Sequence, residues 1–126
     1  MPITVRSLEA RHSLHYQFSG RITADDFDQA AAAEAPYFDA LQPGECLNLI
    51  VNLSALETIS PDLFGRLKQM RLFASDRVCW VVMVGANPYL RALVISLGVL
   101  NQQRRFTFQD RFDEGLRAMG LPSNGH

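Results

Sequence analysis

The amino-acid sequence predicts an α/β domain of two layers, in which about four helices lie mainly on one face of a mixed β-sheet of about five strands. Residues 12–19 and 47–53 alternate between apolar and polar side chains, which is the period of a half-buried strand. Residues 78–84 are apolar on both faces, as is typical of a central strand. A starting hairpin followed by three strand-then-helix segments predicts both antiparallel and parallel pairing.

The composition is that of an ordinary globular chain. The 126 residues are 48% hydrophobic and 20% charged, with a net charge of −1. Because this length suits one domain, we expect a single domain over residues 1–121 and a disordered tail at 122–126. The near-neutral charge gives no electrostatic reason to bind nucleic acid or an anionic membrane. Since no apolar run is long enough for a signal peptide or a membrane span, we expect a cytoplasmic protein.

The N-terminal strands are predicted from their side-chain alternation. Residues 2–9 and 12–19 form a hairpin, and Gly20 ends its second strand. His12 and His15 are assigned to the solvent face of this hairpin.

A first helix is predicted after the hairpin. Thr23 is its N-cap, and Asp26 three residues later approximates a capping box. We expect a break or kink at Pro36, because proline lacks the N–H that a helix interior uses. Pro43 and Gly44 form the following turn.

The segment from Leu47 to Phe64 is the centre of the predicted functional surface. A strand over residues 47–53 leads into a loop, after which Ser60 and Pro61 begin a helix as N-cap and first residue. Open α/β sheets usually bind outside the carboxyl ends of their strands. The candidate partner or switch loop contains Asn52, Ser54, Thr58, Ser60 and Asp62.

The helix predicted over residues 89–100 has almost no polar side. A surface helix normally has one, so this helix is either buried or in contact with a second copy, a partner or a ligand. Ile50, Val81 and Met83 are predicted to form a further apolar strip on the open face of the sheet. The candidate interface residues of the helix are Tyr89, Arg91, Val94, Leu97 and Val99.

The last elements are a short strand and a helix. Residues 104–108 alternate as a strand, Asp110 caps the helix, and Gly120 ends it. The inner side of this helix carries Phe112, Leu116 and Met119.

The cysteines and histidines do not predict a metal site. Cys46 and Cys79 are interpreted as free, buried cysteines, with a disulfide as the less favoured alternative, because nothing in the sequence indicates secretion. His12 and His15 have no further ligand at metal-binding spacing. We therefore expect no metal and no cofactor.

The hydroxyl groups of the loop do not predict catalysis. Ser54 or Ser60 would need a base within hydrogen-bond reach to act as a nucleophile, and the sequence places none nearby. We expect that the protein is not an enzyme. Phosphorylation of Ser54 or Thr58 stays an open alternative, since a helix N-terminus tolerates added negative charge.

Two short segments carry a family resemblance: Asn52-Leu53-Ser54 at a strand end, and Ser60-Pro61-Asp62-Leu63-Phe64 at a helix start. They resemble the Asp-Leu-Ser and Asp-Ser-Ser-Gly-Leu motifs of the STAS domain, which occurs in anti-sigma-factor antagonists and sulphate transporter tails. In the antagonists a kinase phosphorylates a serine of the second motif. Pro61 takes that position here, so the resemblance implies a STAS-like fold without the usual phospho-acceptor. Gly20 to Phe27 and Phe112 to Leu116 also resemble the broader SpoIIAA-like group, which overlaps in fold with lipid-binding CRAL-TRIO domains.

Two functional hypotheses follow. The first is a non-catalytic regulatory or protein-interaction module, a candidate homodimer or binder of another protein, which uses the loop and the 89–100 helix. The alternative is a small-molecule or lipid-binding domain with an apolar pocket near the same helix. A carrier of an apolar ligand often keeps its ligand through purification, whereas an interaction module need not.

Overall fold

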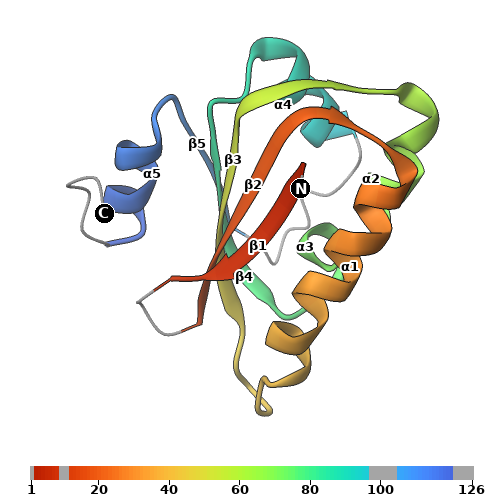
Figure 1. Cartoon of the computed structure of the whole chain (residues 1–126). Coiled ribbons are helices and arrows are strands. Elements are labelled where there is room, and N and C mark those ends of the chain that lie inside the picture. Colours follow the sequence, from red (N-terminus) through yellow and green to blue (C-terminus); the bar gives the residue numbers. More distant parts are fainter. Residues whose placement is uncertain (1, 9–11, 97–104, 121–126) are drawn as a thin grey trace.

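The protein folds around one mixed β-sheet. The structure, a computed structural model, describes residues 2–8, 12–96 and 105–120. In chain order its elements are β1 (Ile3–Ser7), β2 (Ser13–Ile22), α1 (Ala24–Asp39), β3 (Leu47–Ile59), the 3₁₀-helix η1 (Pro61–Leu63), α2 (Phe64–Gln69), α3 (Arg71–Ala74), β4 (Val78–Val84), α4 (Pro88–Ser96), β5 (Arg105–Gln109) and α5 (Phe112–Ala118). The strands lie in the order β1-β2-β3-β4-β5 (Figure 1), with β1 antiparallel to β2 and the other neighbours parallel.

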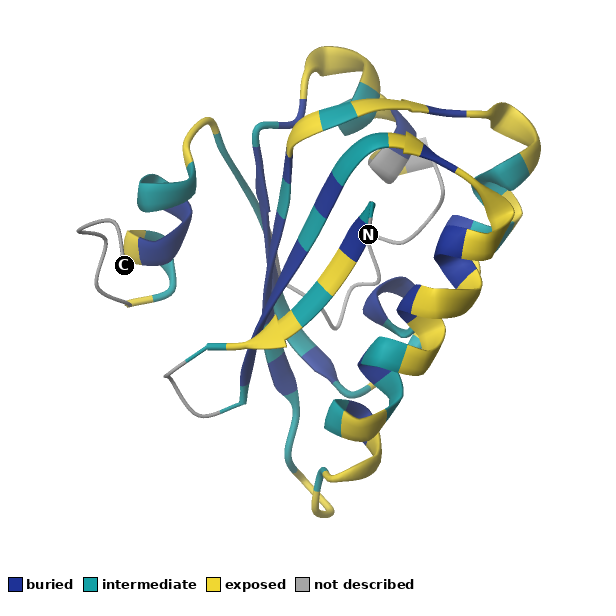
Figure 2. Cartoon of the chain, in the orientation of Figure 1, coloured by how far each residue is buried: buried dark blue, intermediate teal, exposed yellow. Residues whose placement is uncertain are grey.

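The two faces of the sheet are covered unequally. Helices α1 to α4 contribute to the main core on what we call the first face, and α5 packs on the opposite, second face (Figure 1). Figure 2 shows the buried residues of α1 on its sheet-facing side. The prediction of a two-layer fold with helices mainly on one face is confirmed. The smaller cluster on the second face contains Ile50, Val82, Val84 and Leu116.

The predicted open strip of three apolar residues does not exist as one surface. Val81 and Met83 lie in the main core, whereas Ile50 lies beneath α5. The reason is that successive side chains of a strand alternate between faces. Helix α5 lies close to the sheet at Gly115, where an added Cβ would lie 2.7 Å from Cγ2 of Val84.

Beyond the rest of the sheet, β2 and β3 continue as a two-stranded arm, which we define as residues 19–22 and 53–59 (Figure 1). The pairing of β3 with β4 ends at Asn52, so in the arm β3 pairs with β2 alone. The arm therefore leaves one edge of β3 without a neighbouring strand among the described residues.

The arm corrects two predictions, because residues 54–59 are strand and Gly20 does not end β2. Gly20 has a φ of +66° next to an irregularity in the β2–β3 register. Leu53, Leu56 and Ile59, which are buried or half-buried, recur every third residue. A bulge interrupts the alternation of side chains between the two faces of a strand. Without that alternation, the sequence of the arm predicts a loop and not a strand.

Helix α1 begins as predicted and continues further than predicted. The backbone N–H of Thr23 donates to Oδ2 of Asp26 at 2.7 Å, as in a capping box. Pro36 does not break the helix, which runs to Asp39. The proline is exposed, and the next turn still closes through the Ala40 N–H, which donates to the Pro36 carbonyl at 3.1 Å.

The helical segment after η1 is divided at Met70, whose ψ of 142° is not helical. Glu34, which is 1% exposed on α1, accepts hydrogen bonds at this division from the N–H of Arg71 at 2.8 Å and of Leu72 at 3.3 Å. The hydroxyl of Tyr16 on β2 also donates to Glu34, at 2.6 Å. The buried carboxyl group thus joins α1, β2 and the start of α3.

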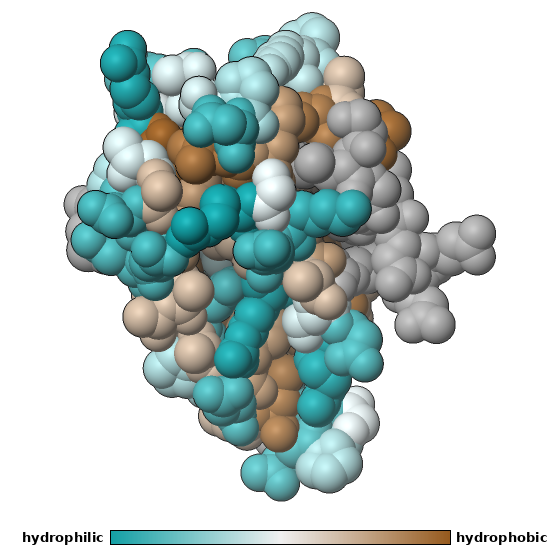
Figure 3. Space-filling view, turned by 90° about the vertical axis from the view of Figure 1, so that its right-hand side faces the viewer, coloured by the Kyte–Doolittle hydropathy of each residue, from teal (hydrophilic) through white to brown (hydrophobic). Residues whose placement is uncertain are grey.

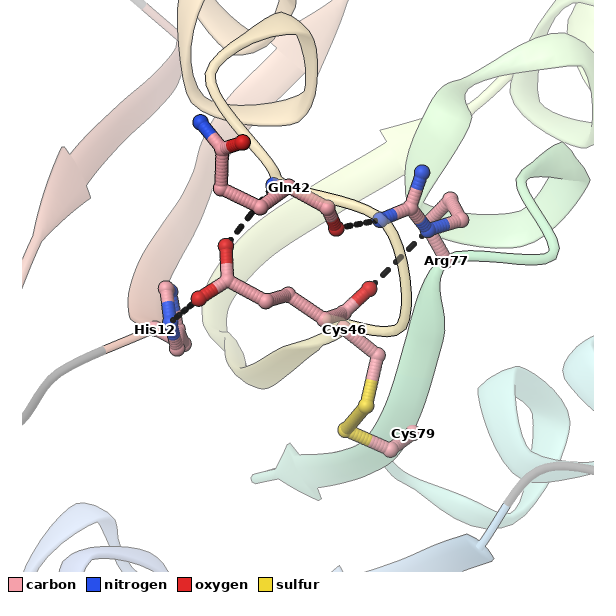
Figure 4. Close-up of polar contacts among 6 residues, drawn as sticks. His12, Gln42, Cys46, Arg77 and Cys79 are labelled. Carbon is pink, nitrogen blue, oxygen red and sulfur yellow. Dashed lines mark hydrogen bonds and ion pairs between the residues drawn. A yellow bond between two sulfur atoms is a disulfide. The ribbon is translucent and has the colours of Figure 1, made fainter.

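Cys46 and Cys79 form a disulfide, so the prediction of free cysteines is wrong (Figure 4). Their Cα atoms are 5.6 Å apart. Leu47 pairs with Val78 and Asn48 pairs with Trp80, so Cys79 has no partner in the β3–β4 register. This irregularity places Cys79 next to Cys46, the residue directly before β3. This proximity depends on strand register, which the sequence alone does not specify.

Polar contacts also hold the loop between α1 and β3 in place beside the disulfide (Figure 4). Arg77 Nε donates to the Glu45 carbonyl at 2.9 Å, and its Nη2 donates to the Gln42 carbonyl at 2.5 Å. The Glu45 carboxylate accepts the Gln42 N–H at 2.7 Å and lies 2.9 Å from Nε2 of His12. The start of β3 is therefore tied to β4 by both covalent and polar links.

Candidate functional site

The candidate surface lies where the carboxyl ends of β3 and β4 meet the arm and the start of α4. At its base, Asn52 Oδ1 accepts hydrogen bonds from the Ser54 N–H at 3.0 Å and from Ser54 Oγ at 2.5 Å. Gly85, with a φ of +73°, lies directly against this pair. An added Cβ at Gly85 would be 2.6 Å from the Cβ of Ser54. The Ser54 hydroxyl is therefore already bonded to Asn52, although the residue is exposed.

A hollow of ≈ 80 Å³ separates the arm from α4. Asn87 caps α4, because its Oδ1 accepts the N–H of Leu90 at 2.8 Å. This cap fixes the direction in which α4 leaves the sheet. The residues that line the hollow are Glu57, Thr58, Ile59, Asn87, Tyr89, Leu90 and Leu93.

Helix α4 has an apolar outer side. Tyr89 is 55% exposed and Ile95 is 52% exposed, and Ala92 between them is also exposed. Side chains three residues apart adjoin on a helix, so these three form one surface, which we call the α4 patch. In the space-filling view, apolar surface gathers in the upper part of the molecule beside the residues drawn in grey (Figure 3).

Arg91, a predicted interface residue, is bound within the domain. Its Nε donates to the Ala86 carbonyl at 3.2 Å, and its Nη2 lies 3.3 Å from Oδ1 of Asp110. Its guanidinium also lies over the ring of Phe108, 5.1 Å from the ring centre. Arg91 therefore ties α4 to β5. Leu97, Val99 and the side chain of Val94 lie outside the described part of the structure.

The other residues of the predicted loop do not converge on one point. Thr58, Ser60 and Asp62 are exposed, but only Thr58 lines the hollow. Thr58 pairs with Arg21 in the arm, so a phosphate added to Thr58 would face a cation. Ser60 makes no side-chain cap, although Pro61 begins η1 as predicted.

The sequence reasoning missed Gly85, Glu57 and Arg21 as parts of this surface. A glycine directly after an apolar strand is a weak signal of close backbone approach, and Gly85 carries it. Glu57 and Arg21 gave no such signal, because their positions depend on the irregular register of the arm.

The sequence pattern also predicts the wrong environment for His15. It was assigned to solvent, yet it is 4% exposed, and its ring lies 4.7 Å from that of Phe112 on α5. Its Nδ1 accepts a hydrogen bond from Nε of Arg6 at 3.1 Å. Burial, and then the charge of Arg6, lowers the pKa of His15 to about 4, while the nearby Gln17 side chain acts in the opposite direction. His15 is therefore neutral at physiological pH.

An apolar cavity of ≈ 20 Å³ lies beneath α4. It is close to the size of one water-sized probe, and far below the volume of a typical small-molecule site. Its walls belong to the main core. The lining residues are Phe18, Val51, Leu53, Ile59, Leu67, Phe73, Met83, Leu90 and Leu93.

Among the described residues, no three His, Cys, Asp or Glu side chains are arranged to hold a metal ion. Within the same ranges, no helix has the length and apolar character that crossing a bilayer requires.

Comparison with known proteins identifies the fold. No protein-family model matches the sequence, and no curated protein matches it. An uncharacterised protein of the DUF3478 family from Shewanella loihica PV-4, described as having a SpoIIAA-like fold, is similar with a TM-score of 0.69 and 12% identity, over 92% of this chain and 90% of that chain. The fold is SpoIIAA-like. The predicted resemblance is thus confirmed.

The anti-sigma factor antagonist SpoIIAA, in its unphosphorylated form, is similar as well. Its TM-score is 0.60 with 16% identity, over 94% of this chain and 99% of that chain. At such identities the similarity concerns the fold alone, and site residues cannot be transferred from it.

Proposed function

We propose that this protein is a non-catalytic regulatory module that binds another protein through the α4 patch and the adjoining arm. One observation carries the proposal: the two large apolar side chains exposed among the described residues, Tyr89 and Ile95, both belong to α4. Single exposed apolar side chains are common on protein surfaces. Two of them on one side of one helix, beside a hollow, form a patch of the kind that a partner buries.

Two further features support this function. The outer edge of β3 in the arm has no neighbouring strand among the described residues, and the main-chain groups of such edges bind extended segments of partners. The similar protein SpoIIAA is itself an anti-sigma factor antagonist, a role that acts on another protein. The sequence resemblance implies Pro61 at the position of the phospho-acceptor, so we infer that control of this module differs from phosphorylation at that site.

Charge introduced into the patch tests the proposal. Ile95→Glu and Tyr89→Glu each place a carboxylate within the α4 patch, and Lys68→Glu on the exposed side of α2 is the matched control. The measurement is chemical cross-linking in the native host, followed by affinity purification and mass spectrometry. We expect a specific partner with the wild type and the control, and at least about tenfold less of it with either patch variant. Equal recovery from all four proteins would contradict the proposal.

Light scattering after size exclusion tests whether the partner is a second copy. In that case the wild type and Lys68→Glu have the mass of a dimer, and Ile95→Glu has the mass of a monomer. A monomer in all three directs the search to a different protein.

The alternative function, binding of a small apolar ligand, rests on the cavity beneath α4. Its ≈ 20 Å³ would have to expand many-fold, through movement of α4, to hold a lipid chain. Native mass spectrometry of the purified protein distinguishes the two functions. A reproducible extra mass that is lost on denaturation favours the ligand carrier, and a bare mass favours the interaction module.

A further inference from the structure

The second face of the sheet has an uncovered polar part beside β1. Arg6 pairs with His15 and Thr4 pairs with Gln17 in the β1–β2 register, so the four side chains form two adjacent cross-strand pairs on one face. They line a concavity of ≈ 350 Å³. Helix α5 covers the neighbouring part of this face, over β3 and β4, and leaves the concavity open.

Arg6 is held in place by a buried group. Its Nε donates to Nδ1 of His15 at 3.1 Å, and His15 is packed under Phe112. Because Nδ1 accepts this bond, the neutral imidazole carries its proton on Nε2, which is buried without a hydrogen-bond partner among the described residues. The imidazole therefore orients the guanidinium but does not neutralise its charge.

The charge of Arg6 has no counterpart in the described part of the chain. Within the described residues its one hydrogen bond is the bond to neutral His15, and its terminal nitrogens have no partner there. Most other arginines with polar contacts are paired with an aspartate. These pairs are Arg66–Asp28, Arg71–Asp39, Arg91–Asp110, Arg111–Asp113 and Arg117–Asp113.

The chemistry of the concavity suits an oxyanion. A guanidinium whose Nε is already occupied still presents two terminal nitrogens, which match the geometry of a carboxylate or a phosphate. The Thr4 hydroxyl and the Gln17 amide are further donors at the rim; the Gln17 amide also contacts the Phe18 carbonyl at 3.4 Å, and its side chain interacts with His15. We propose that Arg6, Thr4 and Gln17 form a binding site for a small-molecule oxyanion, either a carboxylate or a phosphate ester. The site is separate from the α4 patch and does not depend on the function proposed for it.

Titration of the full-length, ¹⁵N-labelled protein tests the site. Inorganic phosphate and, separately, succinate are added near neutral pH at constant ionic strength, and the Arg6 Nε–H and Gln17 amide resonances are followed. We expect saturable shifts of both. Arg6→Gln should weaken binding about tenfold or more, because it removes a charge-assisted hydrogen-bond pair. Arg21→Gln, which alters an exposed arginine in the arm of β2, should change the affinity less than about twofold.

Further variants keep the test valid if Arg6→Gln perturbs the fold. Thr4→Val and Gln17→Leu leave the Arg6–His15 bond in place, and each should weaken binding about threefold. Tighter saturation by phosphate assigns a phosphate ester, and tighter saturation by succinate assigns a carboxylic acid; either result supports the site. Shifts that do not saturate, or that Arg6→Gln and Arg21→Gln reduce equally, would mean an adventitious ion only and would overturn the proposal.

Discussion

Tyr16 and His15 are neighbours on β2, but their buried polar groups are treated differently on the two faces of the sheet. On the first face, the Tyr16 hydroxyl and both oxygens of Glu34 are hydrogen-bonded. On the second face, His15 has one bonded nitrogen and one without a partner among the described residues. A buried polar group is costly unless its bonds are complete. The comparison indicates that the first face is built for stability, whereas the second keeps a less stable arrangement that leaves Arg6 available.

Glu34 on the first face and His15 on the second face respond to acid in opposite directions. Burial raises the pKa of Glu34, so the folded state binds more protons than the unfolded state, and stability from this group rises as pH falls through that raised pKa. Burial lowers the pKa of His15 from 6.5 to about 4, so the folded state binds fewer protons. Stability from His15 is therefore lost as pH falls from about 6.5 towards 4.

The largest effect is expected from removing the polar centre of the first face. Glu34→Ala leaves the Tyr16 hydroxyl and two backbone N–H groups of α3 without their acceptor. We expect the free energy of unfolding to fall by about 4 kcal/mol, measured by urea denaturation. Glu57→Ala, an exposed carboxylate in the arm, is the control and should change it by less than about 0.5 kcal/mol. A loss below about 1 kcal/mol for Glu34→Ala would show that this network is not important for stability.

A smaller effect is expected from displacing α5. A side chain at Gly115 would be forced against Val84 and against Cδ1 of Ile50, 2.8 Å from the added Cβ. Gly115→Val should lower the local stability of α5 by about 2 kcal/mol, seen as faster amide hydrogen exchange in α5. Gly65→Ala on α2 meets nothing within 4 Å and is the matched control. If the main core lost protection as much as α5, the two faces would not be separable.

The smallest effect is the contribution of His15 to pH dependence. His15→Phe removes the titrating group and keeps a ring against Phe112. Between neutral pH and pH 5.5 or so, we expect the wild type to lose about 1 kcal/mol more stability than the variant. Urea midpoints measured across this range give the difference. Identical pH profiles would mean that His15 is protonated as readily in the folded state as in the unfolded state.

The sequence predicted those parts of the fold that depend on local periodicity. The hairpin, the apolar strand β4 and the cap of α1 at Thr23 follow from patterns within a few residues. The arm was taken for a loop, because register irregularities removed the alternation from Leu53 to Ile59. The continuation of α1 through Pro36 was missed as well, since an exposed proline near a helix end loses only one bond.

The candidate site was predictable only in part. The apolar character of α4 predicts Tyr89 as an interface residue, and the structure shows that Tyr89 is exposed. The burial of His15 could not be predicted, because it results from α5 crossing to the second face of the sheet. The Cys46–Cys79 bond depends in the same way on which strands are neighbours.

The disulfide further determines how the chain responds to mechanical force. It closes a loop between residues separated by 33 positions, which contains β3 and the helical segment that follows it. When the oxidised protein is pulled from its ends, this loop cannot extend, so the stretched chain is shorter by roughly 110 Å than the reduced one. Once the segments outside the loop have unfolded, force applied at the chain ends is carried by the disulfide and not by the residues inside the loop. The disulfide therefore prevents such a force from extending β3, whatever the equilibrium stability of the sheet.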